Sequence, residues 1–192
     1  MLDFLKISER TRKGITEVYP KFMIQKSKDL MIRGGDFYAI WIEERGLWST
    51  DENDAIQLID KALMEYADKN KERIGQNPRV LYLWDAETGM IDVWHKYCQK
   101  QMRDSFHMLD EKLIFSNDET TKKDYATKRL SYPLAEGDIS AYDKIISTLY
   151  SPEERHKIEW AIGSIVTGDS KKIQKFLVFY GAAGTGKSTI LN

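Results

Sequence analysis

The clearest hydrophobic pattern in the chain is a stripe of apolar residues at helical spacing. Its members are Ala55, Ile56, Leu58, Ile59, Ala62, Leu63, Tyr66 and Ala67. Residues that recur three and four positions apart lie on one face of an α-helix. Ser49-x-x-Glu52 matches a capping box just before the stripe, and Gly75 with Pro78 would end the helix. We therefore expect an amphipathic helix that begins at Glu52 and buries one face.

Three later stretches have the same periodicity. The first is a face made by Ile91, Trp94, Tyr97, Cys98, Met102, Phe106 and Leu109. The second is made by Tyr142, Ile145, Ile146 and Leu149, and the third by Ile158, Ala161, Ile162 and Ile165. Before the third, Ser151-Pro152-Glu153-Glu154 combines an N-cap serine, a proline at the first helical position and a capping-box glutamate. We expect a helix at each stretch.

Shorter apolar runs predict strands between these helices. Asp36 to Ser49 reads as a hairpin with its turn around Gly46, preceded by a break at Gly34-Gly35. Lys112–Phe115 and Leu130–Tyr132 read as two short strands around the polar loop 116–128. The run from Val80 to Trp84 fits a short strand or the first turn of a helix equally well.

The strongest chemical signal lies at the end of the sequence. The apolar run Phe176–Tyr180 is followed by the phosphate-binding (P-loop) pattern G-x-x-x-x-G-K-[ST], and then by the start of a helix. The residues of this loop are Gly181, Ala182, Ala183, Gly184, Thr185, Gly186, Lys187, Ser188 and Thr189. Glycines let the backbone turn its N–H groups into one concavity that holds phosphate oxygens.

Two side chains of this loop have expected roles in nucleotide chemistry. Lys187 can reach the β- and γ-phosphates of ATP, and the Ser188 hydroxyl can complete the shell of a Mg²⁺ ion. The sequence stops about one helical turn later, before any acidic strand end that could hold the metal. We expect the chain to be an N-terminal piece, or a truncated form, of a longer protein.

These elements predict a two-part chain. Residues 1–135 would form a helix-rich α+β N-terminal domain with short strands and hairpins. Residues 136–192 would form a helical lead-in and the first strand and loop of an α/β P-loop NTPase domain. The boundary is placed at Pro133–Gly137, where turn-forming residues gather.

Composition adds few constraints. The formal net charge is −1, so the chain as a whole is not polybasic, and one cysteine, Cys98, fits a reducing cytoplasm. Residues 1–35 carry eight Lys/Arg against four Asp/Glu. Lys21, Lys26, Lys28 and Arg33 alternate there with apolar residues, which fits either an amphipathic lead-in with a solvated basic face or an arm that contacts nucleic acid. His95-x-x-Cys98 with His107 lacks a fourth ligand at a suitable spacing for a metal site.

The C-terminal succession resembles a known family. The hinge at 133–137, the two helices, Ile158–Gly163 and then Gln174–Gly181 with the phosphate loop look like the phage and plasmid primase-helicase proteins. These are superfamily 3 helicases with an AAA+-like motor. The upstream stretch is similar to the poxvirus- and phage-type domain that precedes this motor, in which a strand like Lys112–Phe115 comes before an Asn, here Asn117.

The resemblance implies an ATP-driven DNA helicase of phage or mobile-element replication. Such motors assemble as homo-oligomeric, usually hexameric, rings on single-stranded or forked DNA and work with a primase or polymerase. The N-terminal domain would be a collar or guide for DNA, and residues 162–168 would lie near the adenine. Asn117-Asp118-Glu119 departs from the family's Asn-Gly-Val, and the chain has no room for a primase domain of its own.

Two alternatives stay open at this point. A different P-loop enzyme, such as a small-molecule kinase, would usually carry the loop near its N-terminus, whereas about 180 residues precede it here. A non-enzymatic module for oligomerisation or DNA loading would suit residues 1–192 by themselves, because one strand cannot form a covered NTPase sheet. We accordingly expect no ATP turnover from this length of chain.

Overall fold

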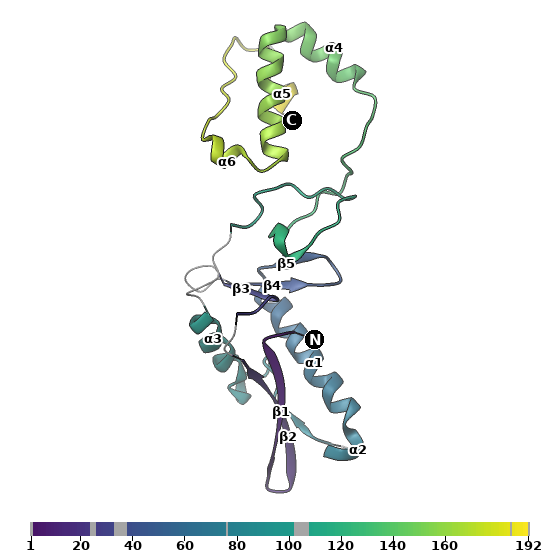
Figure 1. The fold of residues 1–192 in the computed structure, drawn as a ribbon, viewed down its shortest axis with the longest axis vertical. Coiled ribbons are helices and arrows are strands. Elements are labelled where there is room, and N and C mark those ends of the chain that lie inside the picture. Colours follow the sequence, from purple (N-terminus) through teal and green to yellow (C-terminus); the bar gives the residue numbers. More distant parts are fainter. Residues whose placement is uncertain are drawn as a thin grey trace. The chain divides into compact units, whose positions relative to one another are not determined.

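The chain folds as two compact units: the first contains both sheets, and the regular elements described in the second are helices (Figure 1). The computed structural model describes residues 2–23, 26–32, 38–75, 77–101, 108–184 and 186–191. Unit 1 comprises residues 1–108 and 121–127, and unit 2 comprises residues 109–120 and 128–192. This α+β organisation agrees with the class expected for the N-terminal part. The boundary predicted at residue 135 stays a prediction, since the compact units divide earlier, and the chain crosses between them more than once.

Unit 1 begins with a hairpin that the sequence did not predict. Strand β1 (Leu5–Arg12) pairs antiparallel with β2 (Ile15–Phe22) in an unbroken register. Lys13 and Gly14 form the two-residue turn, and both have positive φ angles, 50° and 78°. That backbone matches the right-handed twist of the flanking strands. The short strand β6 (Arg79–Val80) joins β2 in parallel, so the undecided run after Pro78 begins as a strand.

A second three-stranded sheet carries the hairpin that the sequence predicted. It consists of β3 (Leu30–Ile32), β4 (Tyr38–Ile42) and β5 (Leu47–Ser49), with antiparallel pairing throughout. Every residue of β4 is buried. The prediction is confirmed from Tyr38 onward, whereas the expected break at Gly34-Gly35 and the residues Asp36 and Phe37 lie outside the described residues.

Helix α1 (Glu52–Lys69) covers the core of unit 1 with the predicted stripe, and a short helix α2 (Lys71–Ile74) continues it to Gly75. Ala55, Ile59 and Leu63 are fully buried. The predicted cap is wrong: Asp51 is the N-cap, and its carboxylate accepts from the backbone N–H of Asn53. The Ser49 hydroxyl instead donates to the Asp54 carboxylate at 2.6 Å, because the helix begins two residues too late for the box to form.

Helix α3 (Met90–Gln101) follows a 3₁₀ turn, η1 (Ala86–Thr88), and packs against β2 on the core of unit 1. Its Trp94 and Tyr97 pack with Phe4 and Phe22 in an aromatic cluster, with ring centroids 5.0–6.2 Å apart. The expected helix is confirmed to Gln101. Met102, Phe106 and His107 lie outside the described residues, and Leu109, the last residue of the predicted face, lies in a bend and not in a helix.

Residues 121–127 return to unit 1 and pack beside β5. The backbone N–H of Trp48 donates to the Ala126 carbonyl at 2.8 Å, and its indole N–H donates to the Lys122 carbonyl at 3.0 Å. A 3₁₀ turn, η2 (Lys122–Asp124), is held by a capping box between Thr121 and Asp124. Residues 121–127 of the segment predicted as a polar loop are therefore part of unit 1, and the rest of that segment belongs to unit 2.

Unit 2 contains α4 (Ser140–Leu149), α5 (Pro152–Val166), α6 (Ser170–Ile173) and α7 (Lys187–Leu191). The predicted capping box of Ser151 and Glu154 is confirmed. The predicted strands 112–115 and 130–132 are joined by two backbone hydrogen bonds, Leu130 N–H to Ile114 O and Ser116 N–H to Tyr132 O, without forming a regular ladder. The side chain of Asn117 holds the predicted boundary segment at Leu134: its amide N–H donates to the Leu134 carbonyl, and its amide oxygen accepts from the Leu134 N–H.

The apolar faces of the unit 2 helices are less covered than their periodicity predicts. Ile146 of α4 and Ile158 of α5 are buried, but Ile162 and Ile165 are about half exposed. The sequence predicts Ile158, Ala161, Ile162 and Ile165 as one buried stripe of α5, and this prediction is wrong except at Ile158. A helical apolar face is buried only where a neighbouring element covers it, and on α5 that holds at Ile158, in the middle of the helix.

Candidate phosphate-binding loop

The run that leads into the loop, residues 176–180, differs from the buried strand that the sequence predicts. It pairs with no strand of the described part of the chain. The side chains of Phe176, Val178 and Tyr180 are 88%, 66% and 99% exposed. A strand forms when a neighbour takes up its backbone N–H and C=O groups, and the described residues supply none here. The prediction of a buried strand is thus wrong for the chain as it stands.

The loop itself is closed by its own lysine. The Lys187 ammonium donates to the carbonyl of Gly181 at 2.9 Å and to that of Ala182 at 2.6 Å. Helix α7 begins at Lys187, and the N–H of Ile190 bonds back to the Gly186 carbonyl. These contacts draw the first and last parts of the loop into one turn around the lysine side chain.

Glycine is needed at the tightest point of this turn. Gly184 and Gly186 have φ angles of 80° and 76°, in the left-handed region that other residues seldom adopt. A Cβ on Gly186 would lie 2.5 Å from the Cδ1 atom of Leu149, so the loop backbone rests directly on the end of α4. The motif glycines therefore allow both the backbone path and the close approach to the helix behind it.

A cavity of about 320 Å³ lies next to the loop within unit 2. Gly181 and Lys187 border it on the loop side, and Tyr150 and Ile158 border it on the side of α4 and α5. Tyr150 packs edge-on against Phe179, with ring centroids 6.1 Å apart. The cavity is large enough for part of a nucleotide beside the lysine.

Charged side chains of α5 also face this cavity. Glu154 and Lys157 line it. The backbone N–H and the hydroxyl of Ser151 donate to the Glu154 carboxylate, which lowers the pKa of Glu154. Lys157 pairs with Glu153 at 2.6 Å, and this pairing raises the pKa of Lys157. Sequence reasoning recognised Glu154 as a cap and assigned no site role to Tyr150 or Lys157, and no motif could have done so.

The structure brings together some of the predicted site residues. Gly181, Ala182, Gly186 and Lys187 are joined by the lysine contacts and the start of α7, and Ser188 follows on the exposed side of that helix. Ala183 and Gly184 form the outer turn. Thr185 lies outside the described residues, as does the side chain of Thr189. These groups fit a phosphate ligand, because backbone amides and an ammonium are its usual partners.

Three further findings bear on the site. Among the described residues, no cluster of three or more His, Cys, Asp or Glu side chains could hold a metal ion, which includes the surroundings of His95 and Cys98. Within the same residues, no helix is both long and apolar enough to cross a membrane. Comparison with known proteins found no matching family model, curated protein or solved structure.

Proposed function

We propose that the chain binds the triphosphate of ATP at residues 181–189 and is the nucleotide-binding part of an ATP-dependent DNA helicase. The observation that carries the nucleotide-binding proposal is the contact of the Lys187 ammonium with two carbonyls of its own loop. This arrangement holds the lysine at the mouth of a glycine-rich turn. Phosphate oxygens would replace or join the carbonyls as its partners.

Each residue would have a distinct role in binding. The backbone N–H groups of the loop would donate to the phosphate oxygens, and Lys187 would neutralise charge on the β- and γ-phosphates. The Ser188 hydroxyl, exposed at the start of α7, would hold Mg²⁺ together with those phosphates. In phosphoryl transfer, catalysis comes mainly from such positioning and charge neutralisation.

The helicase assignment rests on the resemblance of the C-terminal half to the phage and plasmid primase-helicases. By the same resemblance, the intact protein would form a homo-oligomeric, usually hexameric, ring on DNA. It would work with a primase or polymerase in the host cytoplasm. The loop position, after about 180 residues, argues against a small-molecule kinase.

One observation favours a second function for residues 1–192 taken alone. Phe176, Val178 and Tyr180 expose most of their side chains, and the apolar face of α5 is half exposed. Exposed apolar surface of this kind marks places where proteins associate. The chain would then serve as a non-enzymatic module for oligomerisation or DNA loading, with nucleotide binding but without turnover.

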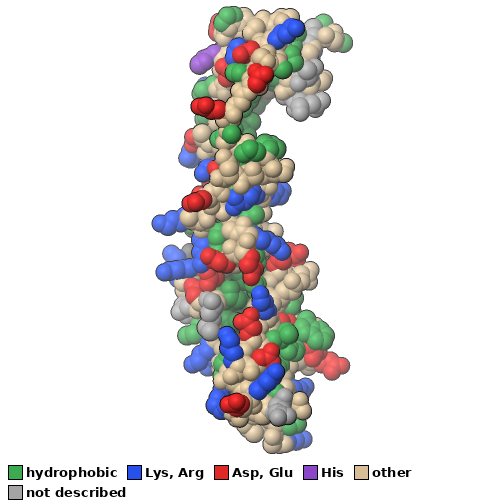
Figure 2. All heavy atoms as spheres, turned by 90° about the vertical axis from the view of Figure 1, so that its right-hand side faces the viewer, with side chains coloured by type: hydrophobic (Ala, Val, Ile, Leu, Met, Phe, Trp, Pro, Cys, Tyr) green, Lys and Arg blue, Asp and Glu red, His purple; other side chains and the backbone are tan. Residues whose placement is uncertain are grey.

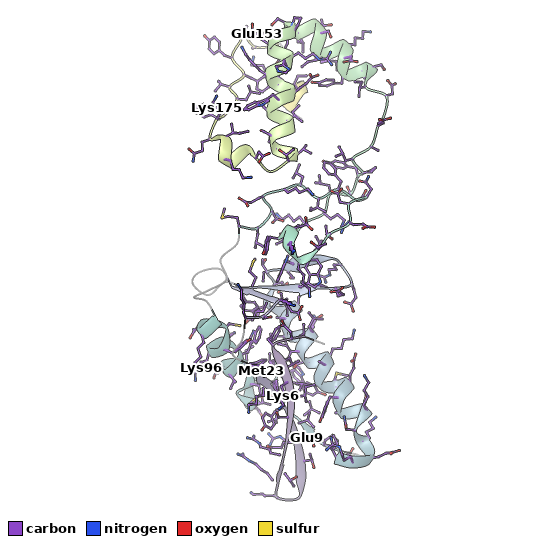
Figure 3. All side chains as sticks on the ribbon, viewed as in Figure 1. Lys6, Glu9, Met23, Lys96, Glu153 and Lys175 are labelled. Carbon is purple, nitrogen blue, oxygen red and sulfur yellow. The ribbon has the colours of Figure 1, made fainter. Side chains whose placement is uncertain are left out.

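Nucleotide binding is tested by titrating the chain with a fluorescent ATP analogue in the presence of Mg²⁺. Lys187→Ala should weaken binding at least tenfold, because it removes the one ammonium that the loop encloses. The matched control is Lys175→Ala, since Lys175 lies before the loop and is exposed (Figure 3). The far-ultraviolet circular dichroism of both variants should equal that of the unsubstituted chain.

Two results would overturn the proposal. Equal binding by Lys187→Ala and Lys175→Ala would show that the loop does not hold the phosphates. Loss of folded structure in unit 1 on Lys187→Ala would show that the lysine is structural. The helicase assignment has its own test: DNA-stimulated ATP hydrolysis by the intact protein, whose absence would remove that part of the proposal.

A further inference from the structure

A second cavity lies in unit 1, between the β1–β2 hairpin and helix α3, and measures about 450 Å³. On the hairpin side it is bordered by Tyr19 and Lys21 of β2. On the helix side it is bordered by Lys96, Tyr97 and Lys100. We call it the hairpin groove. No residue of the phosphate-binding loop belongs to it.

The charges that border the hairpin groove are all positive. Lys21, Lys96 and Lys100 are exposed, and within the described part of the chain none of the three pairs with a carboxylate. Lys6 adds a further cation, because it stands opposite Lys21 in the β1–β2 register. Like charges directly opposite one another destabilise a sheet, and a bound anion would reduce the repulsion between these two lysines.

A fourth lining cation, Arg10, is arranged differently. Its Nε donates to the Glu17 carboxylate at 2.6 Å, and its guanidinium lies over the Tyr19 ring, 5.1 Å from the centroid. Glu17 itself is buried and does not line the groove. Figure 2 shows the contrasting case: over the lower part of the face it draws, basic and acidic side chains are interspersed. The hairpin groove differs because its charged lining residues are all basic.

The floor of the groove is apolar and aromatic. Phe22 and Tyr97 stack there with ring centroids 5.4 Å apart, and Met90 and Val93 extend the apolar surface along α3. Tyr97 is 5% exposed, and its hydroxyl has no hydrogen-bond partner among the described residues.

We infer that the hairpin groove binds a single strand of nucleic acid. Lys21, Lys96 and Lys100 contact its phosphates. The half-buried Tyr19, with the exposed Val93 beside it, receives bases, while Tyr97 supports the floor from the core. Lys96 and Lys100 are one helical turn apart, so both ammonium groups can follow one stretch of backbone (Figure 3 labels Lys96). This site is independent of the nucleotide loop and does not rest on the proposed motor activity.

The combination of cations and rings favours a single strand over other anions. A positively charged groove with stacking side chains suits unpaired bases, which present their ring faces. A duplex keeps its bases stacked inside and would use only the lysines. An acidic peptide or a lipid headgroup could also bind the lysines, but neither presents the flat aromatic rings that would stack on Tyr19.

The test measures the fluorescence anisotropy of a labelled oligothymidylate of 20 nucleotides as the 192-residue chain is added, at a series of salt concentrations. The double variant Lys96→Gln with Lys100→Gln should bind more than tenfold more weakly at about 0.1 M salt. The slope of log affinity against log salt should shrink by about 1.4, since each lost phosphate contact removes about 0.7 for a single strand. Tyr19→Leu should weaken binding about fivefold or more.

The matched control replaces two exposed lysines of the same unit on another helix, Lys61→Gln with Lys69→Gln on α1. It removes the same charge and should leave affinity and slope nearly unchanged. Equal losses in the two double variants would overturn the site, because they would indicate a general charge effect. Circular dichroism melting curves establish that each variant is folded.

Three other outcomes would also overturn the inference. The first is a duplex that binds as tightly as the single strand, with no effect of Tyr19→Leu. The second is full displacement of the oligonucleotide by an equal charge of polyglutamate. The third is Lys96- and Lys100-dependent sedimentation with phosphatidylserine vesicles in the absence of oligonucleotide binding. Binding that persists in Lys187→Ala supports the inference and separates it from the proposed nucleotide site.

Discussion

At the residue scale, Glu9 shows how one side chain can tie three segments together. Its carboxylate accepts from both terminal nitrogens of Arg73, at 2.7 and 2.5 Å, and from the Tyr66 hydroxyl at 2.6 Å. The contact with Arg73 lowers the pKa of Glu9 to about 2. The carboxylate of Glu9 thereby links strand β1 to α1 through Tyr66 and to α2 through Arg73.

This cluster predicts a pH-dependent contribution to stability. The pKa of Glu9 is lower in the folded than in the unfolded state, so its stabilising effect is present above about pH 4.5 and is lost as the pH falls toward 2. Glu9→Gln should lower the melting temperature at pH 7, and the difference should close between pH 5 and pH 2. Thermal unfolding followed by circular dichroism measures this. A difference that is constant with pH, or an equal effect of the exposed-site variant Glu65→Gln, would contradict it.

Other residues show how far a sequence pattern can predict a site. The motif identified Lys187 and its glycines, because phosphate loops need those residue types at that spacing. It could not place Tyr150 or the lysines of the hairpin groove, which meet only through tertiary packing.

At the scale of elements, Asp60 joins α1 to the segment that follows β6. Asp60 is 6% exposed, and its two oxygens accept from the backbone N–H groups of Leu83 and Trp84, at 2.8 and 3.2 Å. Burial raises the pKa of this carboxyl, while the two backbone donors oppose the rise. Beyond Leu81, the segment after β6 pairs with no strand of the described residues, so the Asp60 carboxylate supplies the acceptors for its backbone N–H groups.

Asp60→Ala should therefore destabilise unit 1 by about 2 kcal/mol, because it leaves buried donors unpaired. Asp60→Asn should cost less, since the amide keeps one acceptor oxygen. Urea unfolding followed by tryptophan fluorescence measures both. An alanine variant as stable as the asparagine variant would show that the two hydrogen bonds contribute little.

Elements differ in how well their sequences predicted them, for a physical reason. Helix α1 was predicted because Ala55, Ile59 and Leu63 are all buried on one side. The β1–β2 hairpin was not, because it extends beyond the core and Ile15 near its turn is 52% exposed. Only the end of the hairpin near its turn is solvated, since Leu5 and Val18 are buried, and that solvated end lacks the apolar alternation that indicates a strand.

At the scale of the whole molecule, the two units differ in how much apolar surface they bury. In unit 1 the strands, α1 and α3 share one core with Trp94, Phe4 and Leu63 fully buried. In unit 2 the described residues with buried apolar side chains are Ile114, Phe115, Ile146 and Ile158. Few buried contacts mean a low free energy of local opening.

Limited proteolysis with chymotrypsin should consequently cut first after Phe176 and Tyr180. Both side chains are almost fully exposed, on a segment without a ladder. Trp84, 69% exposed in unit 1, is an internal control: its backbone N–H is held by Asp60, and Leu83 beside it is buried. Mass spectrometry identifies the early fragments. Cleavage at Trp84 ahead of the two C-terminal sites would contradict the ranking.

The return of residues 121–127 to unit 1 has a consequence for how the protein is made. The two N–H groups of Trp48 bind carbonyls that lie more than seventy positions downstream, those of Lys122 and Ala126. During synthesis, the N-terminal fold cannot close at its β5 edge until the ribosome has released the chain past residue 127, by which time residues 109–120 have also emerged. Any attempt to express the N-terminal half by itself has to extend that far, or its indole will be left facing solvent.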